Sequence, residues 1–106
     1  MYIIIEAWWP AGKSAELGKL YLEVMKKYPN DKTIGKSIVP VAVWSDKDGM
    51  HSLVIDSIKP GKVKECIDLA ANRELMMSSI EGYRFQYNIA YDLVEAMPLV
   101  GLKAPE

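Results

Sequence analysis

The strongest constraint on the fold is a strand–turn–helix junction that occurs twice in the chain. The first copy, IIEAWWPAGKSAEL, begins at Ile4, and the second, VIDSIKPGKVKEC, begins at Val54. Each copy has two apolar residues, an acid, a short spacer with proline, and then Gly-Lys before a helical pattern. A chain that repeats such a junction is predicted to consist of two similar βαβ halves.

The segments around these junctions complete the order β-α-β-β-α-β. Strands are predicted over 1–9, 34–44, 50–58 and 83–89 from their alternating apolar spacing. Helices are predicted over 14–28 and 63–80 from helical spacing, with a kink or an end of the second helix at Asn72 as an alternative. The 106 residues suffice for one core but not for two. We therefore expect an α+β fold: one ferredoxin-like βαββαβ domain over 1–106, with an antiparallel four-stranded sheet and both helices on one face. Residues 98–106 are expected to form a loose C-terminal tail.

Proline and serine give two further local predictions. Pro40 cannot donate a hydrogen bond to a neighbouring strand, so the strand over 34–44 should lie at a sheet edge or contain a bulge. Ser14 is a residue type that caps helices, so it is expected to cap the helix that follows it.

The first junction also matches a permissive phosphate-loop pattern, A-x-x-x-x-G-K-S, from Ala7 to Ser14. Three features argue against a nucleotide site. Gly-Lys recurs at Gly61-Lys62 at the equivalent point of the repeat, which suits a turn rather than a phosphate cradle. Pro10 has no N–H group to offer a phosphate. A phosphate-loop fold also needs a larger parallel sheet than this chain can form.

Composition excludes several classes of function. The net charge is −1, which gives no basic excess for nucleic acid, and the strand HSLVIDSI lacks the aromatic residues of RNA-binding relatives of this topology. The single cysteine, Cys66, cannot form an internal disulfide, so a cytoplasmic location is expected. The first residues reach Glu6 too soon for a secretory signal, and no apolar run is long enough to span a membrane.

One face of the predicted sheet has no helix to cover it. Alternation directs Ile3, Ile5 and Ala7 toward the helices and Glu6 and Trp8 toward the uncovered side. In the third strand we expect Leu53 and Ile55 to face the helices and Asp56 to face the uncovered side. The candidate ligand-binding residues on that side are Glu6, Trp8, Trp44, Asp56, Arg84 and Gln86. Because large aromatic side chains would otherwise be exposed, a second copy is expected to cover this face.

Three side chains are candidates for catalysis. Glu6 and Asp56 occupy equivalent positions of the repeat, and as neighbours they could form a general base or a polar anchor for a ligand. The alternative is that they form ion pairs with Arg84. His51 could move protons near neutral pH, or it could be an exposed histidine at a strand end. Cys66 is interpreted as a small core residue. With one histidine and no ligand cluster around it, no metal site is expected.

The opening YIIIEAWWPAGKSAEL, the junction VIDSIKPGKVKEC and the short length resemble the dimeric α+β barrel superfamily. In that group two ferredoxin-like subunits pack their sheets face to face, and members include cofactor-independent monooxygenases, isomerases and haem enzymes. The haem-binding members carry a histidine on a helix, whereas His51 lies in a predicted strand. The resemblance therefore implies a homodimer without a cofactor.

These observations predict a homodimer that binds a small, partly apolar organic molecule in a cleft on the sheet face. A cofactor-independent monooxygenase or isomerase, with Glu6, Asp56 or His51 as its base, is one alternative. A structural or regulatory module without catalysis is another. No nucleic acid or membrane partner is expected.

Overall fold

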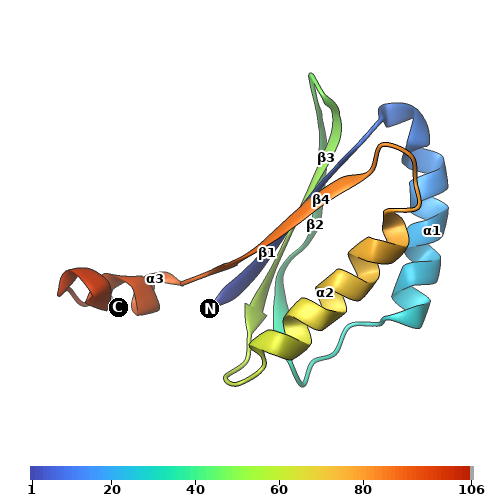
Figure 1. Cartoon of the computed structure of the whole chain (residues 1–106). Coiled ribbons are helices and arrows are strands. Elements are labelled where there is room, and N and C mark those ends of the chain that lie inside the picture. The colour runs from blue at the N-terminus through green and yellow to red at the C-terminus, as the bar shows by residue number, and fades with distance from the viewer. Residues whose placement is uncertain (106) are drawn as a thin grey trace.

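The computed structural model describes residues 1–105, and its elements follow the predicted order (Figure 1). The strands are β1 (Tyr2–Trp9), β2 (Gly35–Asp46), β3 (Gly49–Ile58) and β4 (Arg84–Ala90), and the main helices are α1 (Ser14–Lys27) and α2 (Val63–Met77). The four strands form one sheet in the order β2-β3-β1-β4, with every neighbouring pair antiparallel. Both helices lie on the same side of it (Figure 1). This is the predicted ferredoxin-like topology.

The edge position of β2 agrees with the prediction from Pro40. The pairing of β2 with β3 shifts register between Ser37 and Val39 and again between Val39 and Ala42, so the irregularity spans the proline. An edge strand can accommodate both features because its outer side needs no partner.

The Gly-Lys segment of the first junction is a turn, as the repeat predicted. Residues Ala11–Lys13 form a short 3-10 turn (η1), closed by a 2.9 Å hydrogen bond from the Lys13 N–H to the Pro10 carbonyl. The prediction that Ser14 caps α1 is wrong. Its hydroxyl instead accepts a hydrogen bond from the indole N–H of Trp9 at 3.0 Å, and the cap position, Lys13, makes no side-chain cap bond.

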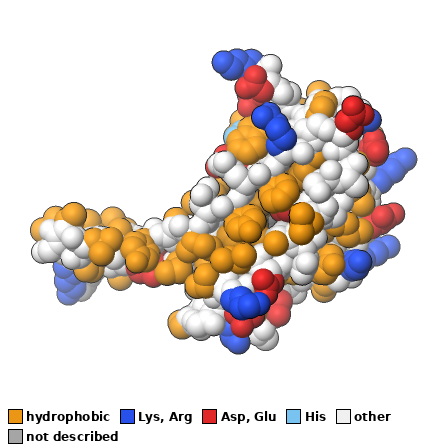
Figure 2. All heavy atoms as spheres, viewed as in Figure 1, with side chains coloured by type: hydrophobic (Ala, Val, Ile, Leu, Met, Phe, Trp, Pro, Cys, Tyr) orange, Lys and Arg blue, Asp and Glu red, His pale blue; other side chains and the backbone are white. Residues whose placement is uncertain are grey.

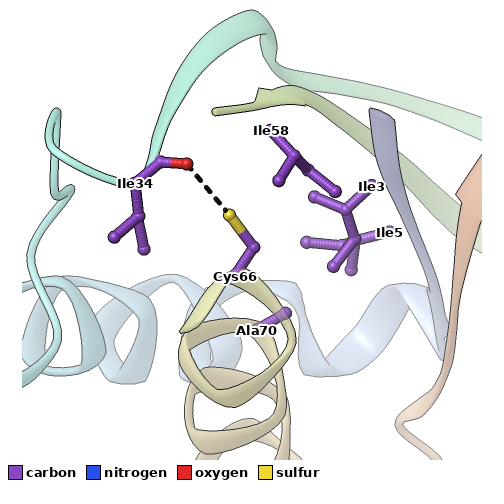
Figure 3. Packing of buried hydrophobic residues seen from close by; sticks show 6 residues of the cluster. All are labelled: Ile3, Ile5, Ile34, Ile58, Cys66 and Ala70. Carbon is purple, nitrogen blue, oxygen red and sulfur yellow. Dashed lines mark hydrogen bonds between the residues drawn. The ribbon is translucent and has the colours of Figure 1, made fainter. Parts of the chain in front are cut away.

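The core lies between the sheet and the helices. Strand β1 alternates as predicted: Ile3 and Ala7 are 1% and 2% exposed and face the helices. Cys66 and Ala70 of α2 pack against Ile3 in one of two core clusters (Figure 3). The Cys66 thiol donates a hydrogen bond to the Ile34 carbonyl at 3.4 Å, and burial raises its pKa. These contacts agree with a core role for this cysteine.

The predicted faces of β3 are wrong by one residue. Cross-strand partners share a face, and β1 pairs Ile3 with Asp56 and Ile5 with Val54. Asp56 therefore faces the helices, while Leu53 and Ile55 face the uncovered side. The physical reason is that β3 has apolar residues at consecutive positions, so alternation gives no preferred face. Burial of Ile58 at the strand end is consistent with the observed register.

The chain continues beyond β4 as a helical segment that extends away from the sheet and helices (Figure 1). It comprises α3 (Leu93–Ala96) and a 3-10 turn, η2 (Met97–Val100), so part of the segment predicted as a loose tail is helical. Asp92 and Glu95 form a capping box at its start, and both carboxylates pair with the N-terminal ammonium group of Met1. The segment is thus fixed to the beginning of β1 by charge and hydrogen bonds.

Within residues 1–105, no helix is both long enough and apolar enough to cross a membrane.

Candidate functional site

Glu6 and His51 meet on the uncovered face of the sheet. Glu6 lies on β1, and His51 lies on β3 directly opposite Trp8. The His51 Nε2 atom is 3.0 Å from Glu6 Oε2, within hydrogen-bond distance. Gln86, opposite Glu6 on β4, donates from its amide to Glu6 Oε1 at a longer 3.4 Å. The sheet therefore brings three of the polar residues predicted from sequence into one cluster.

Two indole rings enclose the imidazole of His51. The Trp8 ring is stacked on it with centroids 4.5 Å apart and planes 21° apart, and the Trp44 ring lies 4.3 Å away at 51°. The His51 side chain is consequently only 13% exposed. The interpretation of His51 as an exposed strand-end histidine is wrong. The flanking strands place both indoles opposite it, and this register was not visible in the sequence.

Glu6 and His51 differ in how far their side chains are enclosed. The faces of the imidazole are taken by indoles, its Nε2 edge by Glu6, and its Nδ1 atom lies 3.8 Å from Asp46 Oδ2. The Glu6 side chain is 26% exposed. Glu6 is thus the accessible member of the pair, and His51 is the enclosed one.

The other predicted site residues do not join this cluster as expected. Asp56 lies across the sheet from Glu6, so the two acids cannot act on one ligand. Arg84 is exposed on the uncovered face opposite Trp8 and forms no ion pair with either acid within residues 1–105. The predicted ion pairs of Glu6 and Asp56 with Arg84 are therefore wrong.

Asp56 instead lines a cleft of about 530 Å³ between the sheet, α2 and the segment that leads into β2. Ile3, Ile34 and Leu69 contribute apolar surface to it, and Arg73 of α2 contributes a guanidinium group. Burial raises the pKa of Asp56, and the nearby positive charge of Arg73 opposes that rise in part. Neither the cleft nor the role of Arg73 is predictable from the sequence, because a single arginine on a helix carries no signal of what it will face.

A second buried carboxyl group, that of Glu74, lies in the last turn of α2. Glu74 is 6% exposed and accepts a 2.5 Å hydrogen bond from the Tyr83 hydroxyl. Burial raises the pKa of Glu74, while the bond from Tyr83 and the charge of Arg73 lower it. The pKa of Tyr83 is raised by burial and by the neighbouring carboxylate. This pair stabilises the junction of α2 and β4 and was also not visible in the sequence.

In the part of the chain that the structure describes, no group of three or more His, Cys, Asp or Glu side chains is placed to hold a metal ion.

No protein-family model matches the chain, and no curated protein matches it. One similar solved structure is a proposed antibiotic biosynthesis monooxygenase from Caulobacter crescentus CB15, with 16% identity, a TM-score of 0.48, and coverage of 86% of this chain and 90% of that one.

Another is a formyltetrahydrofolate deformylase from Pseudomonas putida KT2440, with 11% identity and a TM-score of 0.43. The match covers 84% of this chain but spans only 28% of the deformylase. Neither similarity is high enough to carry an activity over to this protein. The ferredoxin-like fold therefore rests on the strand order β2-β3-β1-β4 itself.

Proposed function

We propose that the protein is a homodimer that binds a small, partly apolar organic molecule on the uncovered sheet face. The observation that carries this proposal is the Glu6–His51 pair, held at 3.0 Å between the rings of Trp8 and Trp44. Flat aromatic side chains beside one accessible carboxylate suit a planar ligand that donates a hydrogen bond.

A second copy supplies the cover that one subunit lacks. Within residues 1–105 no helix lies over this face (Figure 1). The strand register places the apolar side chains of Ile4, Leu53 and Ile55 on it, beside the aromatic cluster. Trp44, at the edge of the cluster, remains 41% exposed. A partner sheet packed on this face would bury these side chains and exclude water from Glu6. The proposed ligand site is therefore completed by dimerisation.

Binding at this face predicts quenching of particular tryptophans. 1-Naphthol, a planar aromatic molecule with one hydroxyl donor, should quench Trp8 and Trp44 but not Trp9, which is buried on the helix side at 8% exposure. Fluorescence titration of Trp9→Phe should retain the quenching, whereas the double variant Trp8→Phe/Trp44→Phe should lose it. Replacing Glu6 by Gln should weaken binding about tenfold, the effect of one hydrogen bond to a charged group. Quenching confined to Trp9 would contradict the proposed location.

The same pair favours a second candidate function, a cofactor-independent enzyme. A carboxylate oriented by a histidine and an amide can accept a proton from an activated aromatic substrate, as a general base does. If the protein consumes anthrone, followed by absorbance, Glu6→Gln should slow the reaction by about 100-fold or more. The matched control is Glu23→Gln, which removes an exposed carboxyl group on α1. Naphthol binding without any turnover would leave a binding module rather than an enzyme.

A further inference from the structure

The cleft on the helix side of the sheet is separate from the Glu6–His51 cluster. Its walls come from β1, α2 and the chain entering β2, including Ile3, Ile34, Leu69 and Ala70, and its volume is about 530 Å³. This is within the range of small-molecule sites in proteins, about 300–1,000 Å³. Figure 3 shows the apolar side of this region, where Ile34 and Ile3 lie around Cys66 and Ala70.

Arg73 brings a fixed positive charge to this cleft. Its Nε–H donates to the Tyr28 carbonyl at 2.8 Å, and its Nη2 donates to the Asn30 side chain at 3.1 Å. These bonds hold the guanidinium in one orientation while using only two of its five N–H groups. Donors therefore remain for a ligand. Arg73 lies within 4.0 Å of no carboxylate in residues 1–105, so a carboxylate ligand would not have to displace an existing ion pair.

Asp56 brings an acceptor to the same cleft from the sheet. It forms no side-chain hydrogen bond and no ion pair with the rest of the described chain, although it is only partly exposed. Within residues 1–105 no buried side-chain oxygen lacks a partner, so the unpaired Asp56 oxygens reach solvent and are open to a hydrogen-bond donor from a ligand. Its charge still interacts with Arg73, so the two groups are near each other but not in contact.

The remaining charged residues around the cleft favour an anion. Lys32 and Lys59 line it, and the only other acid among its lining residues is Asp31. The Asp31 carboxylate already accepts two hydrogen bonds from Thr33, one from the backbone N–H and one from the hydroxyl. The lysines would attract an anionic ligand and orient its charged end.

We propose that this cleft binds a small organic acid that carries a hydroxyl or amino group at its other end. The carboxylate would pair with Arg73, since a guanidinium matches a carboxylate with two parallel hydrogen bonds. The hydroxyl or amino group would donate to Asp56, and the apolar part would lie against Ile34 and Leu69. The site does not depend on the dimer or on Glu6, so it can fail or succeed independently of the proposed function.

The test uses four related probes and NMR of the isotope-labelled full chain. Para-hydroxybenzoate and para-(aminomethyl)benzoate carry both the carboxylate and a hydrogen-bond donor at the opposite end. Benzoate lacks the donor, and para-hydroxybenzamide lacks the negative charge of the carboxylate. The first or second probe should bind at least about tenfold more tightly than benzoate and than the amide. The chemical-shift changes that it causes in the protein should be at Asp56, Leu69 and Arg73. Which of the two binds better identifies a hydroxy or an amino acid as the ligand class.

Variants separate the two ends of the site. Arg73→Gln should reduce the affinity for the two acids to the affinity for the amide. Asp56→Asn should remove the preference for para-hydroxybenzoate or para-(aminomethyl)benzoate over benzoate. Lys19→Gln and Glu23→Gln, exposed charges on α1, are matched controls that should change neither. Because Arg73 also holds the Tyr28 carbonyl, Arg73→Lys is included, which keeps the charge and should keep the preference for acids over the amide.

Three results would overturn the proposal. The first is that none of the four probes, at millimolar concentration, changes the NMR chemical shifts of the wild-type protein. The second is equal binding of the acid and the amide. The third is a set of shifts on Trp8 and Trp44 rather than on the cleft residues. The wild-type comparison of acid with amide decides the question even if Arg73→Gln fails to fold.

Discussion

Replacing Tyr83 by Phe is expected to lower the free energy of unfolding by about 1–3 kcal/mol, the cost of leaving a buried polar group without its partner. The Tyr83 hydroxyl donates a 2.5 Å hydrogen bond to Glu74, whose side chain is almost fully buried. Phe keeps the ring and its packing, so the loss reports on the hydrogen bond. Urea denaturation followed by circular dichroism measures it. Tyr91→Phe, at a position 54% exposed, is the control and should change little.

The same pair predicts how stability depends on pH. Burial raises the pKa of Glu74 above its ordinary value of 4.5, so the native state holds this proton more tightly than the unfolded chain does. Between the pKa of Glu74 in the unfolded chain and its higher pKa in the native state, the native state binds more protons than the unfolded chain. The free energy of unfolding therefore falls as pH rises through this interval. Glu74→Gln removes the titrating group and should show a smaller fall over that interval than the wild type. Parallel curves for the two proteins would contradict the assignment.

Ile55→Lys is expected to dissociate the proposed dimer while leaving each subunit folded. Ile55 lies on a central strand and faces the uncovered side, paired with Ile4. A lysine there would place an unpaired charge in the centre of the proposed interface, which should weaken dimerisation by about 100-fold or more. Sedimentation equilibrium measures the association, and circular dichroism checks the fold.

Leu22→Lys is the matched control for that substitution. Leu22 is 65% exposed on α1, on the other side of the molecule, so a lysine there should leave dimerisation unchanged. Loss of the dimer in both variants would show that added charge, rather than its position on the sheet, is responsible. A dimer that survives Ile55→Lys would exclude the uncovered face as the interface.

The C-terminal segment adds apolar surface that the uncovered face alone does not have. Leu93, Val94, Leu99 and Val100 are each more than half exposed. In Figure 2 apolar side chains gather along this segment and over the adjoining part of the body. The segment is held at its base by the Asp92–Glu95 capping box and by the Met1 ammonium group. Asp92→Ala should release the segment and lower the stability, as measured by urea denaturation.

Sequence patterns predicted the fold well where one physical rule dominated. Alternation in β1 identified the buried side of Ile3 and Ala7, and Pro40 identified an edge strand with irregular pairing. Because the Gly-Lys junction occurs twice, it predicted a turn rather than a phosphate loop. In β3, by contrast, Leu53 and Val54 are both apolar, so alternation could not assign the faces, and Asp56 was placed on the wrong side.

The candidate site was only partly predictable for a related reason. Glu6, Trp8 and Trp44 were each assigned to the uncovered face from alternation or position. Their meeting with His51 depends on the register of two strand pairs, which the sequence does not specify. Arg73 was missed altogether, because its partners come from the loop at Tyr28 and Asn30, far away in the sequence.

The central claim is that the uncovered sheet face meets a second copy and encloses Glu6. The most direct test is an isotope-filtered NMR experiment on a mixture of labelled and unlabelled chains, which detects only contacts between subunits. We expect intersubunit contacts from Ile4, Ile55 and Trp44, and none from Leu22 on α1. A monomer at the concentrations used, or intersubunit contacts confined to the helices, would contradict the claim.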